Sequence, residues 1–419
     1  MRRILITITL CVIVASGNTF TAAADDSESE PQCFGSYYDT QSNDESVAAA
    51  LMAGKLTLPT FGTWNLPAHP KWTEDPFKNR NWVQQFQTLR WLDPLRREGQ
   101  RLNDQAMLNR YTGLIREWLS ANPYGSSKSD LAWYDMVVGS RSLELVCAKA
   151  VAGTATWLST AMTKHAKVLS DPDEYATVGN HALYQDIGLL ALGCTTSTPA
   201  WSDLAVTRSS KLLEKSVDDQ GVTDEGSTNY QLLNYIRYSE MKRHVELCGL
   251  TPQGPFERIP LMTDFLSQAT QPNGRMVAFG DTNAITDAKP IPGTVAEYAA
   301  TQGASGPVPT SLFTVYKRGY AFSRTGWFDT QSADEQAQAA IRFGPALKLA
   351  IHGHEDAGAV SYYAMGSQLL WTPGYNLGGA SDPRRYVKSN EAQNVIDIPG
   401  LTYNSAATSP LGATLTTPT

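Results

Sequence analysis

The stretch Met107–Trp118, M-L-N-R-Y-T-G-L-I-R-E-W, decides the fold class of the larger part of the chain. Its apolar residues recur three and four positions apart, so they lie on one face of an α-helix. Similar stripes recur between about residues 79 and 270, separated by turns rich in Gly, Pro, Asp and Asn. They fall at Trp133–Val146, Trp157–Leu169, His181–Leu192, Leu204–Leu213, Tyr230–Leu247 and Pro260–Leu266. This series predicts antiparallel helical hairpins that share one core.

The composition changes between residues 284 and 311, where Pro, Gly, Ala and Thr dominate. Short β-like runs follow at Leu312–Phe322, Ala337–Phe343, Ala346–Ile351, Ala359–Met365 and Asn394–Ile398. We therefore expect an α+β multidomain protein with a helical domain at 47–290, a linker at 291–311 and a β-domain at 312–404. The Ala/Ser/Thr/Pro-rich residues 405–419 are expected to be a disordered tail.

Residues 1–24 have the features of a secretory signal peptide: two arginines, a short apolar run and three alanines before Asp25. The apolar run is too short to span a bilayer. We expect the mature protein to be secreted, either extracellular or periplasmic. The polar and acidic residues 25–46 are expected to form a flexible leader.

Four cysteines follow the predicted signal peptide, at Cys33, Cys147, Cys194 and Cys248. In an oxidising compartment this even number is consistent with one or two disulfides. Buried free thiols are the alternative.

The chain is acidic, with 34 Lys and Arg against 41 Asp and Glu and a formal charge of −7. Loss of Arg2 and Arg3 with the signal peptide makes this −9. Such a charge disfavours nucleic acid as a partner, and an anionic substrate would need a local basic pocket.

Two polar motifs stand at the beginnings of predicted helices. Asn180-His181 opens one of them, where Asn can cap the first turn and the histidine can simply lie on the surface. The segment Asp224–Tyr230, D-E-G-S-T-N-Y, caps another helix and carries Tyr230 near its first turn. A helix cap followed by a packed aromatic residue is the structural alternative to a functional site.

A third motif, His352-Gly-His354-Glu-Asp356, concentrates two of the six histidines. In a strand, the i, i+2 spacing places His352, His354 and Asp356 on one side. Such a cluster can bind a divalent metal, act as acid and base, or be no more than a polar strand end.

These motifs resemble the heparinase II/III-like polysaccharide lyases, a family that includes heparin, heparan sulfate and alginate lyases. The match runs from about residue 79 to 400. In chain order it comprises Trp133–Arg141 with W-x7-R spacing, Asn180-His181, Glu225-x-Ser227-x-x-Tyr230, His352-x-His354-x-Asp356, Leu369-Leu370-x-x-Pro373-Gly374 and Arg385-Tyr386. The resemblance implies an incomplete α/α toroid followed by an antiparallel β-sandwich, with the polymer bound between them. The sandwich would be shortened, because little chain follows the last matched segments.

The resemblance further implies β-elimination at a uronic acid, in which the C5 proton is removed and the 4-linked sugar leaves. That proton is very weakly acidic beside a carboxylate, so the site must first neutralise the carboxylate. By the resemblance, Asn180 and His352 do so. Tyr230 is the general acid and, for one stereochemistry, also the base, while His181 is the base for the opposite face of the ring.

Further residues are implied as substrate contacts: Trp133, Arg141, Glu225, His354 and Arg385. Of these, Arg141 would pair with charge and Trp133 would stack on a sugar face. In several relatives the second histidine of H-x-H holds a structural zinc with an Asp and another His. Thr372 and Gln393 stand at those two positions here, so we expect neither zinc nor another cofactor.

Two other functions remain possible on the residues alone. An inverting glycoside hydrolase would draw paired carboxylates from Asp186, Asp224, Glu225 or Asp356. A non-catalytic glycan-binding protein would fit a shortened β-domain. For a lyase, the acidic chain favours an unsulfated or lightly sulfated uronan such as alginate over a sulfated glycosaminoglycan.

Overall fold

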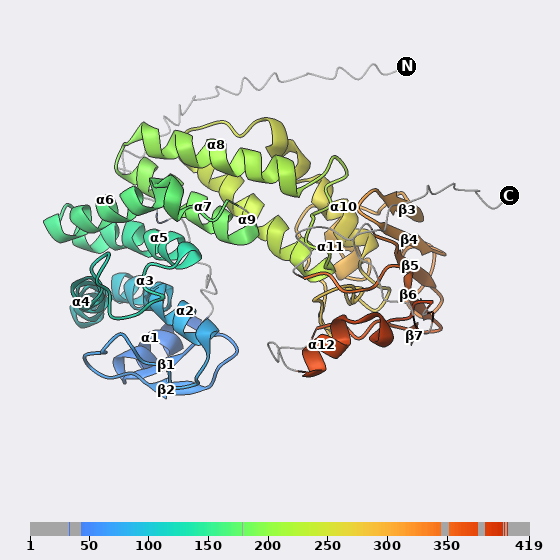
Figure 1. The fold of residues 1–419 in the computed structure, drawn as a ribbon, viewed down its shortest axis with the longest axis horizontal. Coiled ribbons are helices and arrows are strands. Elements are labelled where there is room, and N and C mark those ends of the chain that lie inside the picture. The colour runs from blue at the N-terminus through green and yellow to red at the C-terminus, as the bar shows by residue number, and fades with distance from the viewer. Residues whose placement is uncertain are drawn as a thin grey trace, which may run out of the picture.

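A computed structural model describes Cys33 and residues 43–177, 179–344, 352–375, 382–396, 398 and 400. Figure 1 shows two lobes side by side, a helical lobe from the first part of the chain and a smaller lobe that contains a sheet. The predicted signal peptide, nearly all of the leader, the strand at 346–351 and the C-terminal tail lie outside the described residues.

The helical lobe confirms the predicted series of helices. Its α-helices are α1 (Asp44–Met52), α2 (Arg80–Gln87), α3 (Asp93–Leu102), α4 (Gln105–Ala121), α5 (Asp135–Ala152), α6 (Thr156–Ser170), α7 (Gly179–Thr195), α8 (Pro199–Ser216), α9 (Thr228–Leu247) and α10 (Leu261–Gln268). Short 3-10 turns lie at η2 (Arg90–Leu92), η3 (Pro172–Glu174) and η4 (Gly254–Arg258). A small hairpin, β1 (Lys55–Thr57) and β2 (Thr63–Asn65), follows α1, which itself begins inside the predicted leader.

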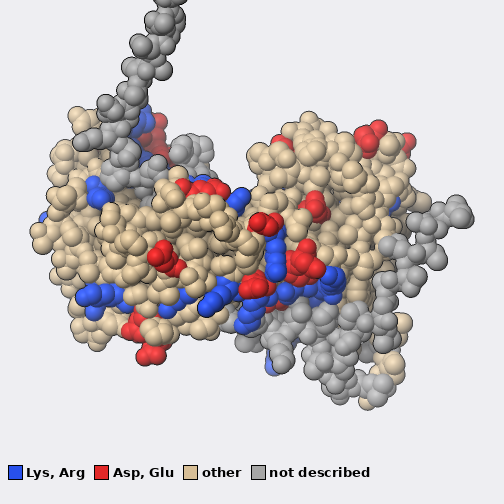
Figure 2. Space-filling view, turned by 90° about the horizontal axis from the view of Figure 1, so that it is seen from above, with Lys and Arg blue, Asp and Glu red and all other residues tan. Residues whose placement is uncertain are grey.

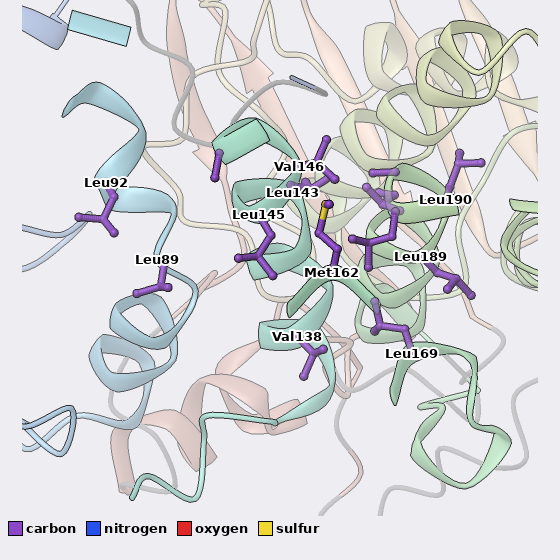
Figure 3. Packing of buried hydrophobic residues seen from close by; sticks show 14 of the residues in the cluster. Leu89, Leu92, Val138, Leu143, Leu145, Val146, Met162, Leu169, Leu189 and Leu190 are labelled. Carbon is purple, nitrogen blue, oxygen red and sulfur yellow. The ribbon is translucent and has the colours of Figure 1, made fainter. Parts of the chain in front are cut away.

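Helix α4 shows how the apolar stripe works. Asp104 caps it, because its side chain accepts hydrogen bonds from the backbone N–H groups of Ala106 and Met107. The buried residues are Tyr111, Leu114, Ile115 and Trp118, which belong to the stripe that predicted the helix. The same rule builds the centre of the lobe, where α5, α6 and α7 contribute side chains such as Leu145, Met162 and Leu189 to one core (Figure 3).

Helices α5 and α7 approach each other through glycines. A Cβ atom added to Gly139 would lie 2.1 Å from the carbonyl oxygen of Tyr184, and one added to Gly188 would lie 2.5 Å from that of Gly139. Both distances are too short for real side-chain atoms, so only glycine permits this approach. The contact fixes the beginning of α7 relative to the beginning of α5.

The second lobe contains an antiparallel sheet of five strands in chain order. The strands are β3 (Phe313–Tyr316), β4 (Tyr320–Arg324), β5 (Gln338–Arg342), β6 (Ala359–Ala364) and β7 (Ser367–Leu370). Its core contains Phe265 from α10, Phe279, Tyr320 and Phe322. The predicted β-domain is therefore confirmed in a shortened form, and its core extends back to residues before the predicted linker.

Several local details differ from the prediction. The run 312–322 folds into a hairpin that turns at Gly319, whose φ is +84°. A short helix, α11 (Val295–Ala300), lies in the predicted linker. The described residues of 394–398 form no strand, whereas β7 and the helix α12 (Asp382–Lys388) were not predicted; a 3-10 turn, η5 (Asn390–Ala392), follows α12.

Two disulfides join the four cysteines, Cys33 with Cys147 and Cys194 with Cys248. This confirms the expectation of one or two bridges. The second bridge connects the last turn of α7 to the residue that follows α9. Among the described residues, no helix is long and apolar enough to cross a membrane.

The glycine contact between α5 and α7 gives a testable prediction. Gly188→Ala should lower the free energy of unfolding by about 1–3 kcal/mol or more, because the new methyl group overlaps the α5 backbone. Gly113→Ala on α4 is the matched control, since an added Cβ meets nothing within 4 Å there. It should be neutral or stabilise by about 0.5–1 kcal/mol. Equal effects of the two changes in urea unfolding would contradict the close approach.

Candidate active site

The side chain of Asp281 lies at the centre of the candidate site and is fully buried. Its carboxylate oxygens are 3.0 Å from His352 Nδ1, 3.0 Å from His354 Nε2 and 2.8 Å from Arg384 Nη2. Burial alone would raise the pKa of Asp281, but the hydrogen bonds from these three partners outweigh it and hold the pKa well below its usual range. A charged carboxylate therefore orients both histidines of the H-x-H motif.

The segment Gly280–Thr282 connects this carboxylate to the helical lobe. Gly280 has a φ of +59°, and an added Cβ would lie 2.2 Å from the carbonyl oxygen of Gly226 and 2.6 Å from that of His352. The N–H of Asp281 donates to the His352 carbonyl oxygen at 2.7 Å. The hydroxyl of Thr282 lies 2.9 Å from the hydroxyls of both Ser227 and Thr228, at the beginning of α9. One short segment thus holds His352 beside the first turn of α9.

Tyr230 and His352 meet where the lobes join. Ser227 caps α9 by accepting from the Tyr230 N–H at 3.4 Å, which places Tyr230 in the first turn as predicted. The rings of Tyr230 and His352 stack with centroids 3.4 Å apart and an angle of 11° between the planes. Burial, followed by electrostatic interactions with Tyr375, Asp281 and Glu225, raises the pKa of Tyr230. Its phenol is therefore protonated in the free protein and suited to donating a proton.

Glu225 completes this part of the site. Its Oε2 lies 3.5 Å from His352 Nε2, and its Oε1 accepts from Asn234 Nδ2 at 3.1 Å. Burial raises the pKa of Glu225, although the hydrogen bond from Asn234 and the charges of His352 and His181 act in the opposite direction. Glu225 therefore belongs to the same electrostatic cluster as His352 and His181.

His181 projects from the first turn of α7 and is held by a residue that the sequence did not single out. Its Nδ1 lies 3.0 and 3.1 Å from the two carboxylate oxygens of Asp135, the first residue of α5. A proton on Nδ1 that is shared with Asp135 leaves Nε2 as the basic nitrogen. The neighbouring Asn180 is half-buried, and its side chain makes no hydrogen bond to any described residue. Its amide is thus available to a ligand.

The site has two walls, which we name by their residues. The helical wall consists of Asp135, Asn180, His181 and Tyr230, and the β wall consists of His352, His354 and their partner Asp281. Figure 2 shows a hollow between the two lobes, with acidic and basic side chains gathered where they meet. Because Tyr230 and His352 are in contact, the walls belong to one site.

One predicted substrate contact does not fit its surroundings. Arg141 is fully buried, donates to His165 Nε2 and to the Gln87 carbonyl oxygen at 2.9 Å each, and lies over the Trp118 ring. It has no surface with which to reach a polymer, so the predicted charge pairing is wrong for this residue. Trp133 is half-buried, packs against His165 and donates to the Asn122 carbonyl oxygen, but it also lines a pocket, so its predicted stacking on a sugar stays a prediction.

Arg385 is exposed on α12, and its predicted contact with substrate stays a prediction. Its neighbour Arg384 reaches Asp281. The side chain of His354 is nearly fully buried and bonds to Asp281 within the β wall. Its burial leaves no surface for the predicted contact with substrate. Sequence reasoning missed Asp281, Arg384 and Asp135, because none is a residue that defines a motif, although Asp135 lies inside the Trp133–Arg141 segment. The one available signal was that two closely spaced histidines need a buried carboxylate to orient them.

The residues around His354 do not fit a zinc site. Its Nε2 is bonded to Asp281, and its Nδ1 lies 3.5 Å from the amide nitrogen of Gln393. The hydroxyl of Thr372 donates to the Ala278 carbonyl oxygen and is not directed to a metal. Asp356 pairs with Arg342 instead of joining the histidines.

The carboxylates proposed for a hydrolase are also accounted for in part. Asp186 is fully buried and accepts a hydrogen bond from the Tyr175 hydroxyl at 2.9 Å.

In the described chain, one group of His, Cys, Asp and Glu side chains is compact enough for a metal ion, namely Cys33, Asp93 and Cys147, and its two cysteines form a disulfide.

The low pKa of Asp281 predicts a pH-dependent contribution to stability. Asp281→Asn should lower the free energy of unfolding near neutral pH by about 3–5 kcal/mol, because it leaves buried donors without their charged partner. As the pKa is lower in the folded than in the unfolded chain, this contribution is complete above about pH 4 and is lost as the pH falls further. Denaturant unfolding of both proteins at several pH values measures it. A difference that stays constant down to strongly acidic pH would contradict the assignment.

Comparison with known proteins adds evidence from the fold alone. No family model and no curated protein matches the chain. A crystal structure of heparinase III matches with a TM-score of 0.69 at 17% identity, covering 85% of this chain and 62% of that one. A heparan sulfate lyase HepC from Pedobacter heparinus matches with a TM-score of 0.63 at 18% identity, covering 82% and 58%.

The chain therefore spans about three fifths of the length of the structures that it matches. The likeness includes both lobes, because it extends over more than four fifths of this chain. A helical region followed by an antiparallel sheet, in the arrangement of heparinase III, is the fold of this protein.

Proposed function

We propose that this protein is an exported polysaccharide lyase that cleaves a uronic-acid-containing polysaccharide by β-elimination. The observation that carries the proposal is the stacked Tyr230–His352 pair, which Asp281 anchors and whose neighbour Glu225 interacts electrostatically with His181 as well. This arrangement supplies donors for a carboxylate and a proton donor next to them. The heparinase III fold supports the same reaction class, and the two disulfides support an oxidising compartment.

Neutralisation of the substrate carboxylate would come from both lobes. The amide of Asn180 has no described partner that competes for it. The ring nitrogens of His352 lie 3.0 Å from Asp281 and 3.5 Å from Glu225, so its ring is held between two carboxylates. Together the Asn180 amide and the His352 ring would stabilise negative charge as it develops on the uronate, which makes the C5 proton removable.

The elimination itself needs one base and one acid. When the base takes the C5 proton, the electrons of the C5–H bond form the C4–C5 double bond and the C4–O4 bond breaks. Tyr230 donates its proton to the departing O4. His181 Nε2, oriented through Asp135, is the base when the C5 proton lies on its face of the ring. For the opposite epimer Tyr230 serves as base as well, and substrate binding must then overcome its raised pKa.

A panel of uronic-acid polymers tests the reaction class. Alginate and heparan sulfate, as unsulfated and sulfated members, should be incubated with the purified protein while ultraviolet absorbance is recorded. An unsaturated uronate absorbs, whereas hydrolysis creates no double bond. We expect a rise in absorbance with at least one polymer. Release of reducing ends without any absorbance gain would favour the hydrolase, and binding without cleavage would favour a glycan-binding protein.

Substitution of Tyr230 tests its role as the proton donor most directly. Tyr230→Phe should lower kcat by about 10²–10⁴-fold and leave substrate binding within a few-fold, because it removes the proton donor and keeps the ring that stacks on His352. Tyr386→Phe is the control, as Tyr386 is largely exposed on α12. Equal turnover by wild type and Tyr230→Phe would remove Tyr230 from the mechanism.

Asp135 is predicted to act as a positioning residue. Asp135→Asn should reduce kcat by about 10–10³-fold on the substrate epimer that uses His181, since an amide no longer fixes the proton on Nδ1. The epimer that uses Tyr230 as base should be affected much less, which a general structural defect would not produce. The pH profile of kcat should also shift on the first epimer. If both epimers lose activity equally, Asp135 is structural only.

A further inference from the structure

A separate pocket of about 260 Å³ opens on the helical lobe beside the candidate active site. It lies between the loop after β1, helix α2, η2 and the first turns of α5 and α7. Its lining consists of Pro59, Thr60, Asn81, Gln84, Gln85, Thr88, Arg90, Met136, Val137, Ser140 and Tyr184. The volume is just below the ~300–1,000 Å³ typical of small-molecule sites, which suits one sugar ring better than a longer segment.

The pocket continues directly from the helical wall. Met136 directly follows Asp135 in α5. On α7, Tyr184 lies three residues after His181, so His181 and Tyr184 lie on the same face of that helix. A second connection runs through Tyr134, whose ring meets the His181 ring edge-on at 5.8 Å. The guanidinium of Arg80 lies over Tyr134 at 5.2 Å, and Arg80 precedes the pocket residue Asn81.

The lining has the hydrogen-bonding character of a site for hydroxyl groups. It contains amides and hydroxyls but no carboxylate, and its one charged residue, Arg90, is 2% exposed. The side chains of Gln84 and Ser140 make no hydrogen bonds to described residues. The side-chain amide of Gln85 donates to the Pro59 carbonyl oxygen at 3.5 Å and to Asn81 Oδ1 at 3.4 Å. An amide and a hydroxyl such as those of Gln84 and Ser140 pair well with sugar hydroxyls.

We propose that this pocket is a sugar-binding subsite that takes an unsulfated pyranose of the polymer next to the residue at which cleavage occurs. A sulfate ester would need exposed Lys or Arg at the lining, and none is present there among the described residues. Arg80, whose side chain is 59% exposed, is not part of the lining and pairs with the exposed carboxylate of Asp130 at 3.6 Å. That the ligand is a uronic-acid polymer rests on the proposed function. The pocket lining adds a preference for unsulfated over sulfated sugar rings.

The test uses Gln84→Ala, with Gln105→Ala as the matched control. Gln105 is an exposed amide at the beginning of α4, away from the pocket lining, where it bonds to Asn109. Binding of defined uronan oligosaccharides, with and without O-sulfate, should be measured by calorimetry in the Tyr230→Phe background, so that no cleavage occurs. We expect Gln84→Ala to weaken binding of the unsulfated oligosaccharide roughly three- to tenfold and Gln105→Ala to leave it unchanged. The sulfated oligosaccharide should bind more weakly than the unsulfated one.

The outcomes separate this inference from the proposed function. If wild type cleaves no polymer, yet the oligosaccharide binds and Gln84→Ala weakens binding, the subsite stands and the lyase proposal fails. If wild type cleaves and Gln84→Ala binds as tightly as its parent, the subsite is wrong and the lyase stands. Preference for the sulfated oligosaccharide, or no binding of either one, also overturns the subsite. Thermal unfolding of Gln84→Ala should match wild type, because this half-buried side chain has no described partner to lose.

Discussion

The site depends on one buried carboxylate. Asp281 holds two histidines and an arginine from segments that lie far away in the sequence, and its neighbours Gly280 and Thr282 attach the same segment to the beginning of α9. A charge without exposure to water is tolerated only when hydrogen bonds and opposite charges replace its hydration. Here this requirement orders the β wall, because His352, His354 and Arg384 all bond to the one buried carboxylate. It also explains how two residues from different lobes, Tyr230 and His352, come into ring contact.

The helical wall depends on a different constraint, which is steric. Gly139 and Gly188 let α5 and α7 approach at backbone distance, and the beginnings of these helices then bring Asp135 to His181. Packing thus sets the geometry of the Asp135–His181 pair, because Asp135 lies four residues before Gly139 on α5 and His181 lies seven residues before Gly188 on α7. The two constraints act on opposite sides of the cleft. One is electrostatic and sensitive to pH, and the other depends only on side-chain size.

Much of the fold could be predicted from periodicity, because amphipathic helices and short strands leave a local pattern. The order of the motifs also identified residues that the structure brings together, in particular Tyr230, His352 and Glu225. What could not be predicted has no local pattern. Asp281 is more than seventy positions from His352 and needed the tertiary fold to reveal it, and Arg384 differs from Arg385 only in the helix face that it occupies. Arg141 matched a motif spacing, yet burial decides its role. The hairpin at Gly319 and helix α11 depend on packing that local composition does not encode.

Helices α5, α7 and α9 all begin at the cleft, where they carry Asp135, His181 and the cap of Tyr230. The peptide dipoles of each helix place about half a positive elementary charge at its beginning. This charge belongs to the backbone, so neither protonation nor substitution of side chains removes it. An overall acidic chain can therefore keep a fixed partial positive charge at the cleft, which partly offsets the carboxylate of Asp135 at the beginning of α5. An anionic ligand would meet less repulsion at the beginnings of these helices than over the rest of the acidic surface.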